Sequence, residues 1–418
     1  MKTRDIKERV VITGMGALTP LGLSVEETWE GLVAGRSGIT EITLFDASQM
    51  PIRIAGEVKG FDPTEYIDFK EARRMARCSQ LALAAGFQAV ADAGLGEHVP
   101  APDRSGVIMG TGIGGLDAAL ESWDTYKARG LKRVNPFMAM ALLCNMPAHH
   151  ISLQFNCQGY NSTVVTACAS GTQSLAEAAE IIRCGKADLM LAGGVEAMVH
   201  EVLIGGFTVM RVLSADNEHP EQAAKPFDAR RDGFVSSEGA AVMVLERLDK
   251  ALARGARIYA EVLGAAANTD AYHVAIPDPD GDGAVRCMRW ALEDAGVEPA
   301  EIDYINAHGP GTVVGDPTET KAIKTLFGEL AYQVPISSTK SMIGHALGAT
   351  GTIEAMACIK TINEGIIHPT INLEVPDPEC DLDYVPLVAR KADVRTTLSN
   401  SFGLGGQNAC LVLRRYED

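Results

Sequence analysis

The sequence has 418 residues, of which 46% are hydrophobic, so it is long enough to bury a large core in two or more domains or in one large fused unit. Its 37 lysines and arginines against 54 aspartates and glutamates give a net charge of −17, which argues against binding to nucleic acid or to an anionic membrane surface. The first residues are charged and no apolar run is long enough for a membrane span, so we expect a cytoplasmic protein.

The N-terminal part of the chain alternates buried strands with helices. VVITGMGALTPLG predicts a strand and a Gly/Pro loop, and Ser24 and Glu27 mark a capped helix that ends near Gly35. SGVIMG predicts a strand before the TGIGG loop and a helix around LDAALESW. STVVTA then leads through a turn at Cys168 into an alanine-rich helix, and ADLMLAGG predicts another short buried strand. This alternation is typical of an α/β architecture.

After Ala260 the same pattern repeats. DYINAH predicts a strand that runs into the loop GPGTVVGDP and a helix, as SGVIMG runs into TGIGG and its helix. VPISST leads through KSMIGHALGATG into the helix TIEAMACIKTI, as STVVTA leads through the Cys168 turn. We therefore predict two pseudo-repeated halves, residues 1–255 and 256–418, joined without a low-complexity linker.

Three short motifs match well-known sites only in part. GTGIGG fits a dinucleotide fingerprint, but no second strand ending in an acidic residue follows it. DPDGDG begins like a calcium loop, but Pro279 interrupts the ligands and Arg289 stands where a glutamate is needed. SSTK fits the start of a serine acylase motif, but no K-T-G follows. None of the three is predicted to be the site that its motif suggests.

Four reactive side chains follow buried strands, at the positions where open α/β sheets bind ligands. Cys168 stands at the start of a helix, where backbone N–H groups and the helix dipole favour a thiolate. His308 ends the strand DYINAH, and His345 heads a small-residue helix with Lys340 five positions earlier and no acidic residue between them. Taken singly, a buried inert thiol is the better explanation of Cys168, and a core histidine explains His308 equally well.

The combination is more specific than its parts. The nine cysteines are odd in number and form no C-x-x-C pair, which argues against a disulfide framework or a zinc ribbon. A cysteine, a lysine and two histidines without metal-ligand spacing indicate acyl-thioester chemistry and no metal site. The segment SNSFGLGGQN adds a predicted tight turn around Phe402, whose backbone N–H groups would face the pocket as an oxyanion hole requires.

The ordered motifs TACASG, NAHG, SSTKSMIGH and SNSFG extend the argument to the whole chain. With them, the sequence resembles the elongating β-ketoacyl-acyl-carrier-protein synthases of type II fatty acid synthesis. The resemblance implies a thiolase-like fold in a layered αβαβα arrangement. It also implies a decarboxylating condensation of malonyl-acyl-carrier-protein with an enzyme-bound acyl thioester, without a metal or redox cofactor.

The resemblance also implies a role for each catalytic residue. Cys168 would accept the acyl chain, and His308 and His345 would hold the malonyl thioester carbonyl as neutral imidazoles. The backbone N–H groups of Cys168 and Phe402 would form the oxyanion hole, and the Phe402 ring would act as a gate. Lys340 would support the histidines electrostatically, with Glu354 behind it.

Binding residues are implied in the same way. Ile113 would shape the far end of an acyl pocket at the interface of a homodimer, and Thr312 would contact the phosphopantetheine arm. Pro310 stands where the family has the first of two threonines, and Thr312 keeps the second. Leu404 and Gln407 change the gating loop, so pantetheine binding and gating are expected to differ. The acyl carrier protein would dock on basic residues, which are Lys70, Arg73, Arg74, Lys132, Arg133 and Arg211.

Three alternatives stay open at this point. GDPTET resembles polyketide ketosynthases more than the fatty acid enzymes, so a ketosynthase of a specialised acyl pathway is the first alternative. A non-catalytic chain-length partner typically lacks the active cysteine, and the presence of Cys168 argues against it. A cysteine hydrolase would leave the second histidine and Lys340 without a role.

Overall fold

The computed structural model describes residues 5, 6 and 8–417, and its main feature is a mixed sheet of ten strands. In chain order these are β1 (Val10–Leu18), β4 (Ser105–Gly110), β5 (Asn161–Val164), β6 (Leu189–Ala197), β7 (Glu238–Arg247), β8 (Ala260–Thr269), β9 (Tyr304–Asn306), β10 (Ile336–Ser337), β13 (Thr396–Gly403) and β14 (Gln407–Arg414). Two small ribbons pair β2 (Ile39–Glu41) with β3 (Ile54–Gly56) and β11 (Ile366–Ile367) with β12 (Arg390–Lys391).

The large sheet consists of two halves with one topology. Its order is β10-β9-β13-β14-β8-β1-β7-β6-β4-β5. The strands of the N-terminal half are β1 and β4 to β7, and those of the C-terminal half are β8, β9, β10, β13 and β14. If the five strands of a half are numbered along the chain, both halves have the order three, two, four, five, one from the outer edge to the centre of the sheet. In both halves the second strand pairs parallel with the third and fourth, and the remaining pairs are antiparallel. The first strands, β1 and β8, join the halves through antiparallel pairing. The predicted pseudo-repeat is confirmed.

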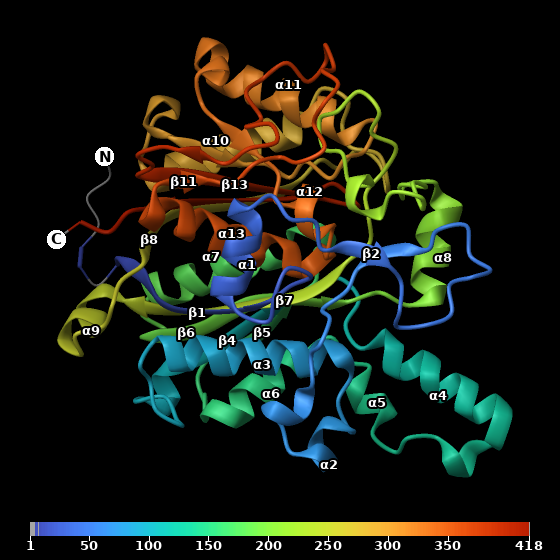
Figure 1. The fold of residues 1–418 in the computed structure, drawn as a ribbon. Coiled ribbons are helices and arrows are strands. Elements are labelled where there is room, and N and C mark those ends of the chain that lie inside the picture. Colours follow the sequence, from blue (N-terminus) through green and yellow to red (C-terminus); the bar gives the residue numbers. More distant parts are fainter. Residues whose placement is uncertain (1–4, 7, 418) are drawn as a thin grey trace.

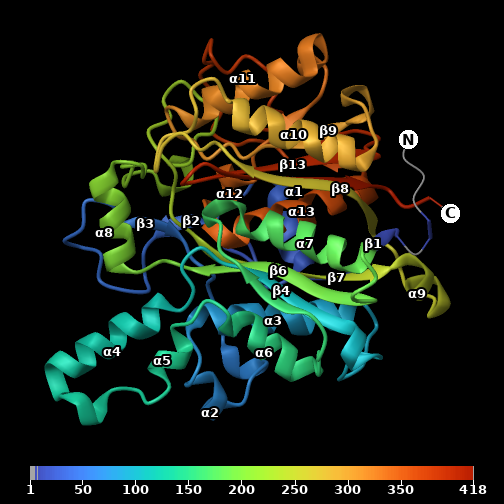
Figure 2. The same ribbon diagram turned by 180° about the vertical axis from the view of Figure 1, so that it is seen from behind.

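Helices cover both faces of each half-sheet. They are α1 (Val25–Val33), α2 (Phe69–Ala72), α3 (Arg77–Asp92), α4 (Leu116–Arg129), α5 (Met138–Ala141), α6 (Met146–Phe155), α7 (Ser170–Arg183), α8 (Glu201–Met210), α9 (Leu248–Ala253), α10 (Asp282–Ala295), α11 (Gly315–Phe327), α12 (Lys340–Ile343) and α13 (Leu347–Glu364). Helices α3 and α6 lie outside the N-terminal half-sheet, α10 and α11 outside the C-terminal one, and α7 and α13 between the two (Figures 1 and 2). The predicted αβαβα layering is confirmed.

Close backbone contacts explain why the two central helices are built from small residues. A Cβ atom on Gly351 of α13 would lie 2.1 Å from Thr172 Oγ1, and one on Gly171 of α7 would lie 2.6 Å from Gly348 O. Larger side chains would therefore push the helices apart, because protein interiors have no spare volume at such contacts. The turn that precedes α7 therefore lies against α13.

The structure confirms the predicted helix cap at Ser24 and shortens the strand predicted to end at His308. Ser24 Oγ accepts a hydrogen bond from Glu27 N at 3.1 Å and caps α1, while Glu27 Oε2 accepts one from Leu23 N at 2.7 Å. Strand β9 ends at Asn306, two residues before His308, so His308 lies in the loop rather than at the strand end. Within residues 5, 6 and 8–417, no helix has the length and apolar character needed to cross a bilayer.

Candidate active site

Cys168 lies on a tight turn between β5 and α7. It is the middle residue of a short 3₁₀ turn, η4 (Ala167–Ala169), and Ala167 adopts a positive φ of 51°. Ser170 Oγ stabilises this turn, since it accepts a hydrogen bond from Thr166 N at 2.8 Å and donates one to Ala167 O at 2.7 Å. The turn holds Cys168, which is only 4% exposed, at the floor of a pocket.

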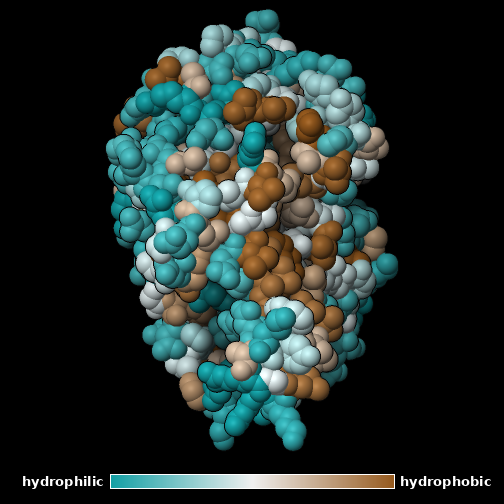
Figure 3. All heavy atoms as spheres, turned by 90° about the vertical axis from the view of Figure 1, so that its right-hand side faces the viewer, coloured by the Kyte–Doolittle hydropathy of each residue, from teal (hydrophilic) through white to brown (hydrophobic). Residues whose placement is uncertain are grey.

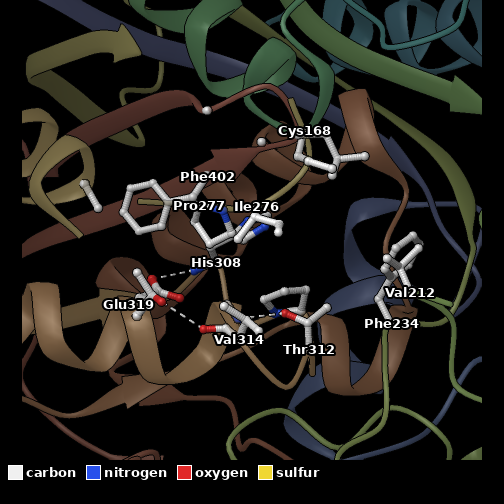
Figure 4. Close-up of a pocket in the computed structure, with 18 of the residues that line it drawn as sticks. Cys168, Val212, Phe234, Ile276, Pro277, His308, Thr312, Val314, Glu319 and Phe402 are labelled. Atoms are coloured by element: carbon white, nitrogen blue, oxygen red, sulfur yellow. Dashed lines mark hydrogen bonds between the residues drawn. The ribbon is translucent and has the colours of Figure 1, made fainter. Parts of the chain in front are cut away.

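Three distant segments bring their side chains together in that pocket. His345 Nε2 lies 3.1 Å from Cys168 Sγ, and the rings of His345 and His308 are 5.3 Å apart in an edge-on arrangement. The Phe402 ring lies 6.1 Å from the His308 ring and lines the same pocket. Figure 4 shows Cys168, His308 and Phe402 around this space. The sequence-predicted constellation is therefore assembled in the structure.

The surroundings of both histidines favour the neutral imidazole. Burial lowers the pKa of His308 and of His345 well below the usual value, and the nearby Lys340 ammonium lowers both further. His345 Nδ1 lies 3.1 Å from Thr350 Oγ1, which can donate its hydrogen and leave the proton of the imidazole on Nε2, toward the pocket. Neutral imidazoles held this way suit the donation of hydrogen bonds to a thioester carbonyl.

His308 is positioned through its backbone. Its N–H and that of Gly309 donate to the two carboxylate oxygens of Glu319, at 2.8 and 2.7 Å. Positive φ angles of 34° at Gly309 and 86° at Gly311 form the bend on either side of Pro310. Glu319, on α11 beside His308 in Figure 4, was not singled out from the sequence, although it belongs to the GDPTET segment that follows the histidine loop.

Lys340 has a buried acidic partner that comes from another helix. Its ammonium lies 2.5 Å from Glu354 Oε1 on α13 and also donates to His308 O. The segment between Lys340 and His345 contains no acidic residue, but Lys340 is nevertheless paired, because Glu354 from α13 forms an ion pair with it. Burial raises the pKa of Glu354 to about 7, and the ammonium opposes that rise.

The expected low pKa of the Cys168 thiol was wrong. Burial raises the pKa of Cys168 to about 11, which outweighs the lowering by the Leu404 backbone N–H and by Lys340. Burial therefore favours the thiol over the thiolate in the resting side chain.

The C-terminal hairpin packs against the Cys168 turn. Strands β13 and β14 pair antiparallel, and the pair next to the connecting turn is Gly403 with Gln407. Gly405 and Gly406 in that turn have positive φ angles. A Cβ atom on Gly403 would lie 3.1 Å from both Cys168 N and Thr166 O. The hairpin backbone therefore lies against the backbone of the Cys168 turn, and the predicted tight turn after Phe402 is present.

Cys168, His308 and His345 place one donor atom each within 4.8 Å of one another, which is close enough for a metal ion. The Lys340 ammonium beside both histidines opposes the binding of a second cation there. The donor set and its electrostatics thus fit an organic carbonyl better than a metal.

The implied binding residues are distributed around the pocket. Ile113 packs against a small apolar cluster of Cys168, Met198 and Leu347. Pro310, Thr312 and Leu404 line the pocket, and Thr312 Oγ1 accepts a hydrogen bond from Gly315 N at 3.1 Å. Figure 3 shows apolar side chains gathered around a hollow on this face. Exposed apolar residues that line the pocket are Ile276, Val313 and Val314.

The six basic residues expected to dock a carrier protein are all exposed. Lys70 lies on α2, with Arg73 and Arg74 directly after it, and the Arg74 guanidinium lies 4.7 Å from the centre of the Phe137 ring. Arg211, at the C-terminal end of α8, lines the pocket. Lys132 and Arg133 form a 3₁₀ turn after α4.

Together these features define a thiolase-like α/β protein with a cysteine–histidine–histidine pocket. Family models for the Beta-ketoacyl synthase N-terminal and C-terminal domains match residues 7–251 and 259–374. The chain belongs to the β-ketoacyl synthase family.

Relatives match over nearly the whole chain. The chain is 47% identical to 3-oxoacyl-[acyl-carrier-protein] synthase 2 of Synechocystis sp., covering 98% of this chain and 99% of the relative. It is 45% identical to the protein of that name from Coxiella burnetii, and the match covers 99% of this chain and 100% of the relative. A solved ishigamide ketosynthase/chain length factor superposes with a TM-score of 0.92 at 39% identity, covering 98% of this chain and 99% of that one. A type II polyketide ketosynthase in complex with its acyl-carrier protein superposes with a TM-score of 0.90 at 34% identity, covering 98% of this chain and 99% of that one.

Proposed function

We propose that the protein condenses malonyl-acyl-carrier-protein with an acyl group held on Cys168, with loss of carbon dioxide, and so elongates fatty acids. The observation that carries this function is the 3.1 Å contact between Cys168 Sγ and His345 Nε2 in a pocket that also holds the neutral His308. Curated relatives at 47% identity carry the name of this activity.

In the first step Cys168 takes the acyl group. Its sulfur forms a bond to the thioester carbon, the bond from that carbon to the carrier sulfur breaks, and the thiol proton goes to the departing carrier thiolate. The backbone N–H groups of Cys168 and Leu404 stabilise the oxyanion of the tetrahedral intermediate. Leu404 takes the place expected for Phe402, because its backbone N–H already donates a hydrogen bond to the Cys168 thiol.

In the second step the malonyl thioester carbonyl accepts hydrogen bonds from His308 and His345. Carbon dioxide leaves, and the electron pair of the broken C–C bond forms an enolate whose negative oxygen faces the two donors. The enolate carbon attacks the acyl thioester on Cys168, the C–S bond breaks, and the sulfur takes up a proton from solvent. Lys340, held by Glu354, adds positive charge behind both histidines.

The carrier protein and the second subunit belong to the same proposal. We assign residues 1–255 to the half that carries the nucleophile and residues 256–418 to the half that carries the histidines, Lys340 and the gating hairpin. Phosphopantetheine contacts Thr312, and a homodimer forms in the cytoplasm. Strand β5 supports the homodimer, because it ends the large sheet and is followed by Val165, which is 52% exposed.

The polyketide alternative is weaker because the ishigamide ketosynthase/chain length factor and the type II polyketide ketosynthase are 39% and 34% identical to this chain. The relatives named 3-oxoacyl-[acyl-carrier-protein] synthase 2 are up to 47% identical. The test is incubation of the purified protein with acyl and malonyl carrier proteins, followed by mass spectrometry of the products. We expect a β-ketoacyl carrier, no product from Cys168→Ala, and retained malonyl decarboxylation by Cys168→Gln. Cys78→Ala, at a buried cysteine of α3, is the matched control and is expected to keep condensation. Product formation by Cys168→Ala contradicts the proposal.

A further inference from the structure

Glu196 is a fully buried carboxylate that the proposed chemistry does not use. It lies on β6, whose parallel pairing with β4 ends at Gly110↔Gly194, so Glu196 extends past the end of β4. Residues two apart on a strand share a face, and Gly194 faces α13, since a Cβ atom there would lie 2.3 Å from Gly348 O. The side chain of Glu196 therefore points into the space between the loop after β4 and the start of α13.

Four hydrogen-bond donors converge on this carboxylate. Oε2 accepts from Gly112 N at 2.7 Å and Gly348 N at 3.0 Å. Oε1 accepts from Ile113 N and from Thr111 Oγ1, both at 3.1 Å. Thr111 Oγ1 itself accepts from Gly114 N, so its own hydrogen is available to Glu196. Because every partner donates, only a group with four acceptor positions satisfies the whole set.

The four bonds connect two backbone segments on either side of the thiol. The first is the loop 111–115, which carries Ile113, and the second is the first turn of α13, which begins with Leu347 at a φ of 35°. Leu347 and Cys168 belong to one apolar cluster, and Ile113 packs against it. A Cβ atom on Gly348 would lie 2.6 Å from Thr111 Cα, so the two segments are in direct contact.

The catalytic histidine is held independently of Glu196. His345 N donates to Val235 O at 2.8 Å, and His345 O accepts from Ser237 N at 3.1 Å. Loss of the Glu196 hydrogen bonds is therefore expected to move the loop 111–115 and the start of α13 more than it moves His345.

We propose that Glu196 is a positioning residue that fixes the spacing between the loop 111–115 and α13, and that this spacing sets the length of the acyl chain that Cys168 accepts. The inference rests on the proposed transfer of an acyl group to Cys168. An amide in place of the carboxylate turns an NH₂ group toward backbone N–H donors, so the loop and the helix have to separate or shift. Acyl chains long enough to reach Ile113 contact the displaced loop 111–115 and the start of α13, whereas short acyl chains do not.

The test compares the transfer of short, medium and long saturated acyl groups from carrier protein to Cys168 in the wild type and in Glu196→Gln. We expect the ratio of long-chain to short-chain transfer to change by about tenfold, the size of effect that the loss of a charged hydrogen bond produces. Malonyl decarboxylation by Glu196→Gln/Cys168→Gln is expected to equal that of Cys168→Gln. Glu246→Gln is the matched control, since Glu246 is also buried but binds Arg254 and Thr13 away from the pocket.

A second measurement separates positioning from general damage. The negative charge of Glu196 raises the pKa of Cys168, so alkylation of Cys168 in Glu196→Gln is expected to occur at lower pH than in the wild type. If Glu196→Gln does not fold, Thr111→Val keeps the carboxylate, removes one donor and is expected to change the chain-length ratio in the same direction by a smaller factor.

An unchanged chain-length ratio in a folded variant overturns the inference, and so does a loss of decarboxylation in proportion to transfer. Failure of the wild type to form an acyl-Cys168 thioester would instead refute the proposed function.

Discussion

The ammonium of Lys340 lies 2.5 Å from the Glu354 carboxylate, and the two side chains are 1% and 0% exposed. The same ammonium donates to the backbone carbonyl of His308 and lowers the pKa of both active-site histidines. The buried ion pair thus contributes to the stability of the C-terminal half, and its ammonium also favours the neutral form of His308 and His345. Its two partners come from α12 and α13, so the pair exists only when those helices are packed.

Glu354→Gln is predicted to destabilise the fold by about 3 to 5 kcal/mol, because it leaves the Lys340 ammonium buried without its counter-charge. Lys340→Met/Glu354→Gln removes both charges and is expected to be more stable than Glu354→Gln alone. Urea unfolding of the single and double variants measures the difference. Equal stabilities of Glu354→Gln and the wild type contradict the role of the pair.

Lys340→Met is predicted to shift the acid limb of malonyl decarboxylation to higher pH. The reaction needs neutral imidazoles, whose pKa values are held low by burial and by Lys340, so activity persists until the pH falls through those low values. Without the ammonium the pKa values rise, and activity is lost earlier as the pH falls. The rate is measured against pH for Cys168→Gln with and without Lys340→Met. Lys321→Met, at an exposed lysine that pairs with Asp280, is expected to leave the profile unchanged.

Alkylation of Cys168 by iodoacetamide is predicted to keep rising with pH up to about 11, since burial raises the pKa of this thiol to about that value. Exposed Cys184 serves as the internal reference in the same digest, because its reaction does not depend on access to the pocket. Peptide mass spectrometry quantifies both sites at each pH. A plateau of Cys168 labelling near neutral pH would show that the bound thiolate is stabilised more than the structure indicates.

Thr350→Val is predicted to slow malonyl decarboxylation roughly tenfold with little change in overall stability, because it removes the hydroxyl that holds His345 Nδ1 and with it the preference for a proton on Nε2. Thr350→Ser restores the hydroxyl and is expected to recover the rate. The variants are compared by carbon dioxide release in the Cys168→Gln background. Equal rates for the valine and serine variants contradict this orientation of the imidazole.

Reversal of charge at Arg73 and Arg74 is predicted to raise KM for carrier-bound substrates with little change in kcat, since exposed charges steer an acidic carrier but lie outside the pocket. The effect is expected to shrink at high salt and to disappear with substrates on free pantetheine. Arg289→Glu, on the exposed side of α10, is the control for a change of net charge. A rise in KM for free pantetheine substrates would place these arginines in the pocket instead.

Local patterns were sufficient to predict the elements around the site. The Ser24 cap, the buried strand SGVIMG and the turn at Cys168 depend on residues close together in the chain, so the periodicity and the capping residues identify them. The repeat of strand, loop and helix predicted two halves of the same architecture, and the structure gives both halves one strand order. His308 was placed at the end of a strand and lies two residues beyond it, the kind of boundary that local patterns leave open.

The sequence by itself determined the alternating architecture, its repetition and the reactive groups of the site, since these depend on residue type and on order along the chain. Only the tertiary structure decided how those groups behave. Glu354 reaches Lys340 from 14 residues away, His345 meets Cys168 across 177 residues, and Glu196 binds Gly348 across 152. The expected thiolate at Cys168 was wrong because the cost of burying its charge exceeds the gain from nearby donors, and burial is set by packing.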